Sequence, residues 1–191
     1  MFKYMSKLFL MGILSIVLRG ISGVGKSVLT HCLERVLDKL GKRVAVISKD
    51  AYRRYLDETE GYHYTKEEER KVTEWYRETY RETAKRDDLD YIICDNTHTR
   101  EEEILIPCTP TGNVEKIVVV FVGTHASRTD SKVGDEVIER QRNELEESTP
   151  LMIALYSRGD IEWFDLPPRH GNEDVAREII SECEIIKHEF I

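Results

Sequence analysis

The sequence predicts one α/β domain in which a parallel β-sheet is covered by helices on both faces. Short apolar segments of strand length alternate with longer segments of helical period, and no break in composition divides the 191 residues. Parallel strands are joined by crossover helices, so this alternation favours parallel pairing. A hydrophobic content of 40% and a charged content of 34% fit a compact globular chain.

Four apolar segments have the length and composition of buried strands. They are residues 13–18, 44–47, 91–94 and 117–122. Residues 1–12 are expected to be an N-terminal extension or the start of the first strand. The apolar run that begins there is too short to span a bilayer, and it leads directly into a glycine-rich loop.

Segments of helical period lie between these strands. Residues 26–40 place leucines and valines on one face and stop at Gly41, a frequent helix terminator. A long charged segment opens with the capping box Thr65-x-x-Glu68. Residues 159–172 hold two glycines and two prolines and are expected to be a loop. The predicted helices are residues 26–40, 65–85, 135–147 and 173–181.

Residues 20–27 read Gly-Ile-Ser-Gly-Val-Gly-Lys-Ser and match G-x-x-x-x-G-K-[ST] at every fixed position. A strand precedes them and a helix follows, so backbone N–H groups and the positive helix end can face phosphate oxygens. Lys26 is expected to reach the β- and γ-phosphates, and Ser27 to bind Mg²⁺. The pattern predicts a P-loop NTPase-type sheet that binds ATP or GTP. The predicted nucleotide-binding residues in this loop are Gly20, Ser22, Gly23, Val24, Gly25, Lys26 and Ser27.

Polar residues follow the second strand, at the sheet edge where the phosphate loop also lies. Asp50 is placed to accept the proton of a hydroxyl acceptor as general base. Arg53 shares its side of a short helix and, with Arg54, is a candidate substrate ligand. The alternative is that Asp50 only caps this helix and Arg53 is solvated.

A second carboxylate ends the third strand. Asp95 is expected to bind Mg²⁺ through water or to orient Ser27, as a Walker-B carboxylate does. The alternative is a cap on the following turn. Asn96 and Thr97 come next and are candidate substrate-binding residues facing the same side.

Together, the phosphate loop and the segments 48–53 (S-K-D-A-Y-R) and 94–97 (C-D-N-T) resemble the 5′-polynucleotide kinase family. The resemblance covers about residues 13–100. It implies transfer of the ATP γ-phosphate to a 5′-hydroxyl end of RNA or DNA, with Asp50 as general base and Arg53 as a ligand of the acceptor phosphate. Members of that family are often fused to a phosphatase or a ligase domain. This chain has no D-x-D-G-T-like nucleophile motif and too few residues for either domain, so we expect residues 1–191 to be a lone kinase domain.

Residues 126–160 are expected to form a helical lid that brings a cation to the moving phosphoryl group. Arg140 is the candidate catalytic cation and Arg142 a candidate nucleotide ligand, although residues two apart on a helix diverge. Glu144 stands where the resembled family tends to have a second arginine, so the lid departs from the family pattern. A solvated helix of charged pairs is the alternative. Other candidate lid arginines are Arg128 and Arg158.

The charge is unevenly distributed. Residues 1–54 carry eleven Lys/Arg against three Asp/Glu, a net of +8, whereas the remainder carries a net of −16. A basic segment around the phosphate loop suits a nucleic-acid end and equally a small phosphorylated ligand. The acidic runs 67–69 and 101–103 are expected to be solvated. Aromatic residues at 62, 64, 75, 76 and 80 belong either to the core or to a base-stacking surface.

The four cysteines are scattered, which predicts free thiols in a reducing, cytoplasmic setting with no structural metal and no membrane partner. Two rival functions stay open. One is a P-loop kinase for a small-molecule or peptide-linked substrate, similar to gluconate kinase, adenylylsulfate kinase or zeta toxin. The other is a nucleotide-binding module that transfers nothing, although no N-K-x-D-like guanine-reading block is present.

Overall fold

The computed structural model describes residues 12–123, 133–166 and 173–188. Their strands form one five-stranded sheet in the order β2-β3-β1-β4-β5, and every neighbouring pair is parallel. The phosphate loop follows the central strand of this sheet. The strands are β1 (Ile13–Arg19), β2 (Val44–Ile47), β3 (Tyr91–Asp95), β4 (Val114–Val122) and β5 (Glu162–Leu166).

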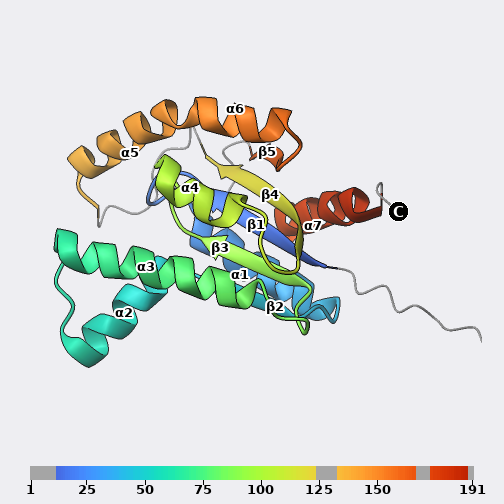
Figure 1. Cartoon of the computed structure of the whole chain (residues 1–191), viewed down its shortest axis with the longest axis horizontal. Coiled ribbons are helices and arrows are strands. Elements are labelled where there is room, and N and C mark those ends of the chain that lie inside the picture. The colour runs from blue at the N-terminus through green and yellow to red at the C-terminus, as the bar shows by residue number, and fades with distance from the viewer. Residues whose placement is uncertain (1–11, 124–132, 167–172, 189–191) are drawn as a thin grey trace, which may run out of the picture.

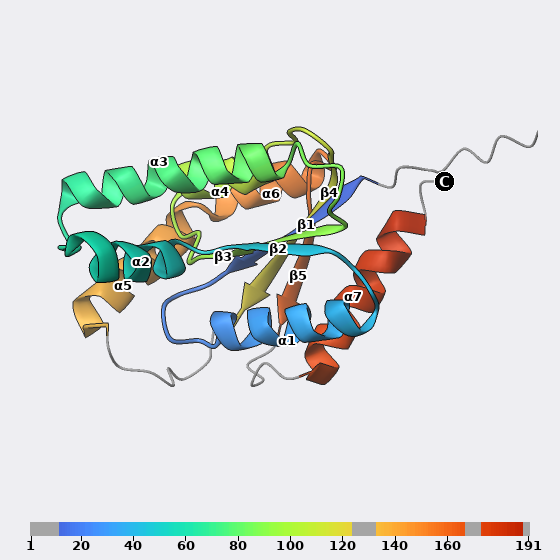
Figure 2. The same ribbon diagram turned by 90° about the horizontal axis from the view of Figure 1, so that it is seen from below.

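Helices cover both faces of the sheet, which confirms the predicted fold class (Figures 1 and 2). One face carries α1 (Lys26–Lys39) and α7 (Glu173–His188). The opposite face carries α3 (Lys66–Thr83), α4 (Glu101–Cys108) and α6 (Thr149–Ser157). Two further helices, α2 (Lys49–Glu60) and α5 (Asp135–Glu147), lie toward the end where the strands finish.

The alternation of side chains along the buried strands creates two apolar cores. On one face, Leu14 and Ile16 belong to the cluster that includes α1 and α7. On the other, Val17 belongs to the cluster that includes Tyr76 and Tyr80 of α3. All seven residues of β1 are buried, so the strand that leads into the phosphate loop is held from both faces.

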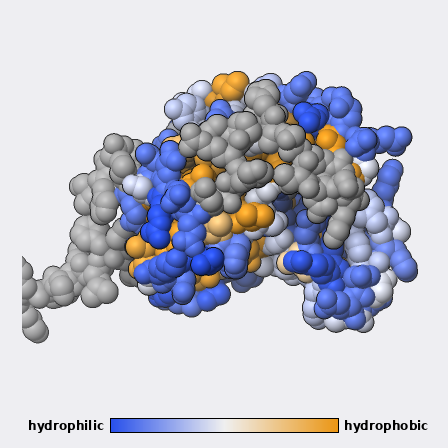
Figure 3. Space-filling model, turned by 180° about the vertical axis from the view of Figure 1, so that it is seen from behind, coloured by the Kyte–Doolittle hydropathy of each residue, from blue (hydrophilic) through white to orange (hydrophobic). Residues whose placement is uncertain are grey.

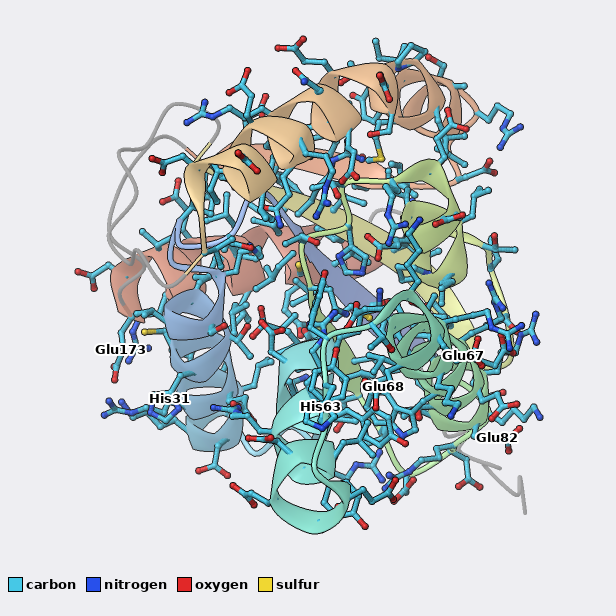
Figure 4. The ribbon with its side chains drawn as sticks, turned by 90° about the vertical axis from the view of Figure 1, so that its left-hand side faces the viewer. His31, His63, Glu67, Glu68, Glu82 and Glu173 are labelled. Atoms are coloured by element: carbon cyan, nitrogen blue, oxygen red, sulfur yellow. The ribbon has the colours of Figure 1, made fainter. Side chains whose placement is uncertain are left out.

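Helix α3 begins as its capping box predicts. The Glu68 backbone N–H donates to Thr65 Oγ1 (3.2 Å), and the Glu68 carboxylate accepts the His63 backbone N–H (3.1 Å). Glu68 and His63 therefore meet where the chain passes from α2 into α3 (Figure 4). The aromatic positions of this helix divide between two roles: Tyr76 and Tyr80 are core residues, whereas the Trp75 ring stacks on Tyr52 of α2 at 4.1 Å.

Three expectations about this architecture were wrong. Residues 159–172 were expected to form only a loop, yet 162–166 form β5, a partly exposed edge strand without a continuous apolar run. Residues 101–103 were expected to be solvated; Glu101 and Glu102 are exposed in the first turn of α4, but Glu103 is buried. Helix α6 follows α5 directly and was not expected as a separate element.

Most of the N-terminal stretch 1–12 and the first part of the expected lid, 126–132, lie outside the described residues. Within the part of the chain that the structure describes, no helix is both long enough and apolar enough to cross a bilayer.

Candidate nucleotide-binding and phosphoryl-transfer site

The phosphate loop joins β1 to α1 through glycines with backbone angles that favour glycine. Gly23 has φ 81° and Gly25, the residue before α1, has φ 96°. Gly20 N–H donates to Thr97 O (3.0 Å), and a Cβ at Gly20 would lie 2.5 Å from Val122 O. Backbone from β4 and from the segment after β3 therefore packs against the first residue of the loop. This close approach fixes where the loop begins.

Lys26 lies beneath the loop with its side chain buried. Its Nζ donates to Gly20 O (2.9 Å) and Ile21 O (2.7 Å), so the side chain folds back toward the first residues of the loop. Burial lowers the pKa of Lys26 to about 8, although the carboxylates of Asp95 and Asp50 act to raise it. The amine is therefore still protonated at neutral pH and can contact phosphate oxygens.

The donor set for a magnesium ion is also in place. The Asp95 carboxylate ends β3 and interacts with Ser27 at the start of α1. Burial raises the pKa of Asp95, while Ser27 and the charge of Lys26 lower it. Among the described residues no cluster of three His, Cys, Asp or Glu side chains forms a protein-only metal site. One hydroxyl and one carboxylate suit Mg²⁺, which takes its other ligands from water and nucleotide phosphates.

The Asp95→Asn substitution is expected to raise the Mg²⁺ concentration needed for tight ATP binding by about 10- to 100-fold, because the loss of a residue that orients a metal ligand typically lowers metal affinity by that factor. A Mg²⁺ titration of ATP affinity by calorimetry measures the effect. Asp57→Asn on the exposed side of α2 is the matched control and should leave the titration unchanged. An unaltered Mg²⁺ requirement in Asp95→Asn would remove this residue from the metal site.

Asp50 lies in the first turn of α2, whose N-cap is Ser48 (Ser48 Oγ accepts Ala51 N–H, 3.3 Å). Capping is therefore done by Ser48, which leaves the Asp50 carboxylate available for another role. Its side chain is 79% exposed, yet its charge raises the pKa of both Lys26 and Asp95. The carboxylate thus faces open space and is still within electrostatic reach of the phosphate loop.

Arg53 is not a solvated side chain. Its Nε and Nη2 each donate to the Glu69 carboxylate at 2.7 Å, and its Nη1 pairs with Asp50. The Tyr62 hydroxyl also donates to Glu69. Arg53 therefore joins Asp50 to α3. The Nε and Nη2 donors, which could bind a phosphate in a bidentate manner, are already bonded to Glu69. Arg54, the next residue, is exposed.

The start of α2 is held in place by a buried ion pair. Lys49 Nζ lies 2.5 Å from Glu103 Oε1, and both side chains are at most 8% exposed. The Lys49 backbone N–H donates to Asn96 Oδ1 (2.8 Å), and Arg100 also pairs with Glu103 (3.0 Å). Asn96, predicted as a substrate ligand, is thus buried and binds the backbone that precedes Asp50. Thr97 contributes its carbonyl oxygen to the phosphate loop.

His98 is a site residue that sequence reasoning missed. It is fully buried, with Nδ1 2.7 Å from Leu18 O and Nε2 2.8 Å from the Tyr76 hydroxyl. A carbonyl can only accept, so Nδ1 carries the proton and Nε2 accepts from Tyr76. Burial lowers the pKa of His98 to about 4, so the ring is neutral at physiological pH. Its φ of 48°, rare for a residue other than glycine, is the signal of a constrained turn.

The candidate lid arginines that the structure describes do not converge on the loop. Arg140 pairs weakly with Glu144 (3.7 Å) and is 58% exposed, and Arg142 is exposed. Arg158 pairs with Asp160 beyond α6, while Arg128 lies outside the described residues. The residue of α5 that reaches the phosphate loop is Gln141, whose Oε1 accepts the Ser22 N–H at 2.8 Å.

A phosphate loop that follows the central strand of a parallel sheet, with helices on both faces, defines a P-loop NTPase-type fold. Asp95 ends the adjacent strand β3, and Asp50 follows β2, the next strand along. Residues 16–109, just under half of the chain, match the family model described as an AAA domain. No curated protein matches the sequence significantly.

Many solved structures share the fold. A gluconokinase from Sinorhizobium meliloti 1021 superimposes with a TM-score of 0.55 at 16% identity, over 92% of this chain and 94% of that one. The Mycobacterium tuberculosis APS kinase CysC in complex with AMPPNP and APS gives 0.52 at 15% identity, over 91% and 98%. A chain of the Pnkp1/Rnl/Hen1 RNA repair complex gives 0.51 at 13% identity, over 73% of this chain and 46% of that one. Identities this low establish the fold and not the substrate.

Proposed function

We propose that this protein is an ATP- and Mg²⁺-dependent kinase that transfers the γ-phosphate to the hydroxyl of a small molecule. The observation that carries the proposal is the position of Asp50: its carboxylate is solvent-accessible and yet acts electrostatically on Lys26 and Asp95. A general base must meet an incoming hydroxyl from the open side while it faces the phosphate being transferred. The surface is hollowed beside the lobe that α2 and α3 form (Figure 3), and Asp50 lies in the first turn of α2.

In this mechanism Asp50 accepts the hydroxyl proton as the acceptor oxygen bonds to the γ-phosphorus. The bond from that phosphorus to the β–γ bridging oxygen breaks, and ADP leaves. Lys26 and the backbone amides of the loop stabilise the charge on the phosphates. Ser27 and Asp95 would hold Mg²⁺, which neutralises part of the same charge.

The charges around Asp50 favour an acceptor without a phosphate beside its hydroxyl. Glu69 and Asp50 together compensate the single positive charge of Arg53 and occupy most of its hydrogen-bond donors. A phosphate that binds next to Asp50 would be repelled by the carboxylates of Asp50 and Glu69. It would also find no free pair of Arg53 N–H donors for a bidentate contact. The structural likeness to gluconokinase and APS kinase is compatible with such an acceptor but concerns the fold alone.

A 5′-hydroxyl end of RNA or DNA is the second candidate acceptor. Arg54 is exposed directly after the Asp50–Arg53 pair, and the rings of Tyr55 and Tyr64 are 56% and 73% exposed on the α2–α3 side of the molecule. Exposed aromatic rings beside a cation are the usual means of binding a single strand. This candidate also rests on the family resemblance of the segments around Asp50 and Asp95.

An acceptor panel tests both candidates. With ATP labelled at the γ-phosphate and Mg²⁺ present, label is expected to move to neutral sugars, polyols or amino alcohols more readily than to 5′-hydroxyl oligonucleotides. The Asp50→Asn variant serves as the blank in every reaction. Preferential labelling of oligonucleotides would replace the first candidate by the second. Failure of every acceptor of both kinds, with ATP still bound, would reject the kinase assignment.

A further inference from the structure

Helix α5 contacts the phosphate loop through one reciprocal pair of hydrogen bonds. The Ser22 backbone N–H donates to Gln141 Oε1 (2.8 Å), and Gln141 Nε2 donates to Ser22 Oγ (3.1 Å). The two bonds orient the side-chain amide so that its oxygen faces the loop. Ser22 N–H is one of the backbone donors that the loop motif offers to phosphate oxygens.

The rest of the same helix face is anchored on the end of β1 and on the segment that follows β3. Thr99 Oγ1 donates to Glu144 Oε2 (2.5 Å), and Arg19 Nη2 donates to Leu145 O (3.2 Å) and Ser148 Oγ (2.6 Å). Positions 141, 144, 145 and 148 follow helical spacing, so one face of α5 makes all these contacts.

Arg19 immediately precedes the phosphate loop and is fully buried. Its Nε and Nη1 have no hydrogen-bond partner among the described residues, and the Phe121 ring lies 5.3 Å away. Burial lowers its pKa to about 10, so the guanidinium still carries its charge. A buried cation that bonds to α5 with its remaining donors makes the C-terminal part of this helix a fixed support beside the loop.

We propose that Gln141 is a positioning residue that competes with a phosphate oxygen of ATP for the Ser22 backbone N–H. The inference rests on the proposed function, because it requires that the loop binds a nucleoside triphosphate. One N–H serves one strong acceptor, and a phosphate oxygen forms a charge-assisted bond about twice as strong as a neutral amide oxygen does. Nucleotide binding therefore separates Gln141 from Ser22.

The coupling is reciprocal, so a contact that must be broken on binding lowers nucleotide affinity. The Gln141→Leu substitution removes the competing acceptor and is expected to tighten binding of a non-hydrolysable ATP analogue with Mg²⁺ by about 2- to 10-fold, the value of one hydrogen bond. Gln141→Glu places a charged acceptor on the same N–H and repels phosphate, so it is expected to weaken binding by at least as much. Calorimetry on the full chain measures both.

Competition predicts changes in nucleotide affinity of opposite sign for these two variants. A merely structural role predicts that both substitutions loosen α5 and weaken binding. Asn143→Ala, an exposed residue on the same helix, is the control and should bind like the wild type. Thermal denaturation without nucleotide checks that all three variants are folded. Weaker or unchanged binding by Gln141→Leu overturns the inference.

The outcomes also distinguish this inference from the proposed function. If the two variants shift affinity in opposite directions while no acceptor is labelled, only the kinase proposal fails. If the wild type labels an acceptor while Gln141→Leu binds no tighter, only the role of Gln141 fails. If the wild type binds no nucleotide, both are rejected.

Discussion

Replacing Asp50 by asparagine is expected to slow phosphoryl transfer by about 10²- to 10⁴-fold, the usual contribution of a general base. Asparagine keeps the size of the side chain but accepts no proton. ATP affinity should change little, because the phosphates are held by Lys26 and the loop amides. Single-turnover transfer with labelled ATP measures the rate, and calorimetry measures the affinity.

A matched variant separates the role of Asp50 from that of its ion pair. Arg53→Met breaks the pair with Asp50 but leaves the carboxylate, so it should retain far more activity than Asp50→Asn. If Asp50→Asn transfers phosphate at the wild-type rate, the carboxylate is a surface charge and the chain has another base. If neither the wild type nor the Asp50→Asn variant transfers phosphate, the interpretation as a nucleotide-binding module is favoured.

Replacing Lys49 by methionine is expected to lower the free energy of unfolding at pH 7 by up to about 3–5 kcal/mol, the cost of breaking a buried ion pair, because only the half-exposed Arg100 then remains beside Glu103. Lys49 and Arg100 hold the pKa of Glu103 at about 2 against the opposing effect of burial. Without the Lys49 amine, burial favours the neutral form of Glu103. Urea denaturation followed by circular dichroism measures the loss.

The pH dependence of this loss has a definite sign. A depressed carboxyl pKa stabilises the folded protein above the unfolded pKa, near 4.5, and this stabilisation disappears as the pH falls toward 2. The deficit of Lys49→Met should therefore be largest at neutral pH and shrink below about pH 4. The double variant Lys49→Met/Glu103→Leu should recover most of the stability. A deficit of equal size at all pH values would show that the lost packing of Lys49, and not its charge, is responsible.

The parts of the fold that depend on local pattern could be predicted from the sequence. The first four strands, the helix after the phosphate loop and the capping box at Thr65 follow from periodicity and turn chemistry within a few residues. Strand β5 escaped prediction because its residues are only partly buried and include Asp165. Helix α4 escaped because it opens with three glutamates and contains Pro107, features that are typical of loops and helix ends.

The site divides in the same way. The loop motif places Lys26 and Ser27 without reference to the rest of the chain, and the strand ends place Asp50 and Asp95 near them. The partners of these residues come from distant positions that no local pattern reveals. Glu69 is 16 residues from Arg53, and Glu103 is 54 residues from Lys49. The roles of Arg54, Thr97, Arg140 and Arg142 stay predictions.

The central position of β1 determines when the phosphate site can exist. β1 is synthesised before the two strands on either side of it, β3 and β4, which end at residues 95 and 122. Until β4 has been synthesised, one edge of β1 lacks its partner, and an unpaired apolar edge invites pairing with other chains. A nascent chain therefore cannot form the complete phosphate site until it has been made as far as residue 122. Until then, the apolar edge of β1 stays without its partner strand β4.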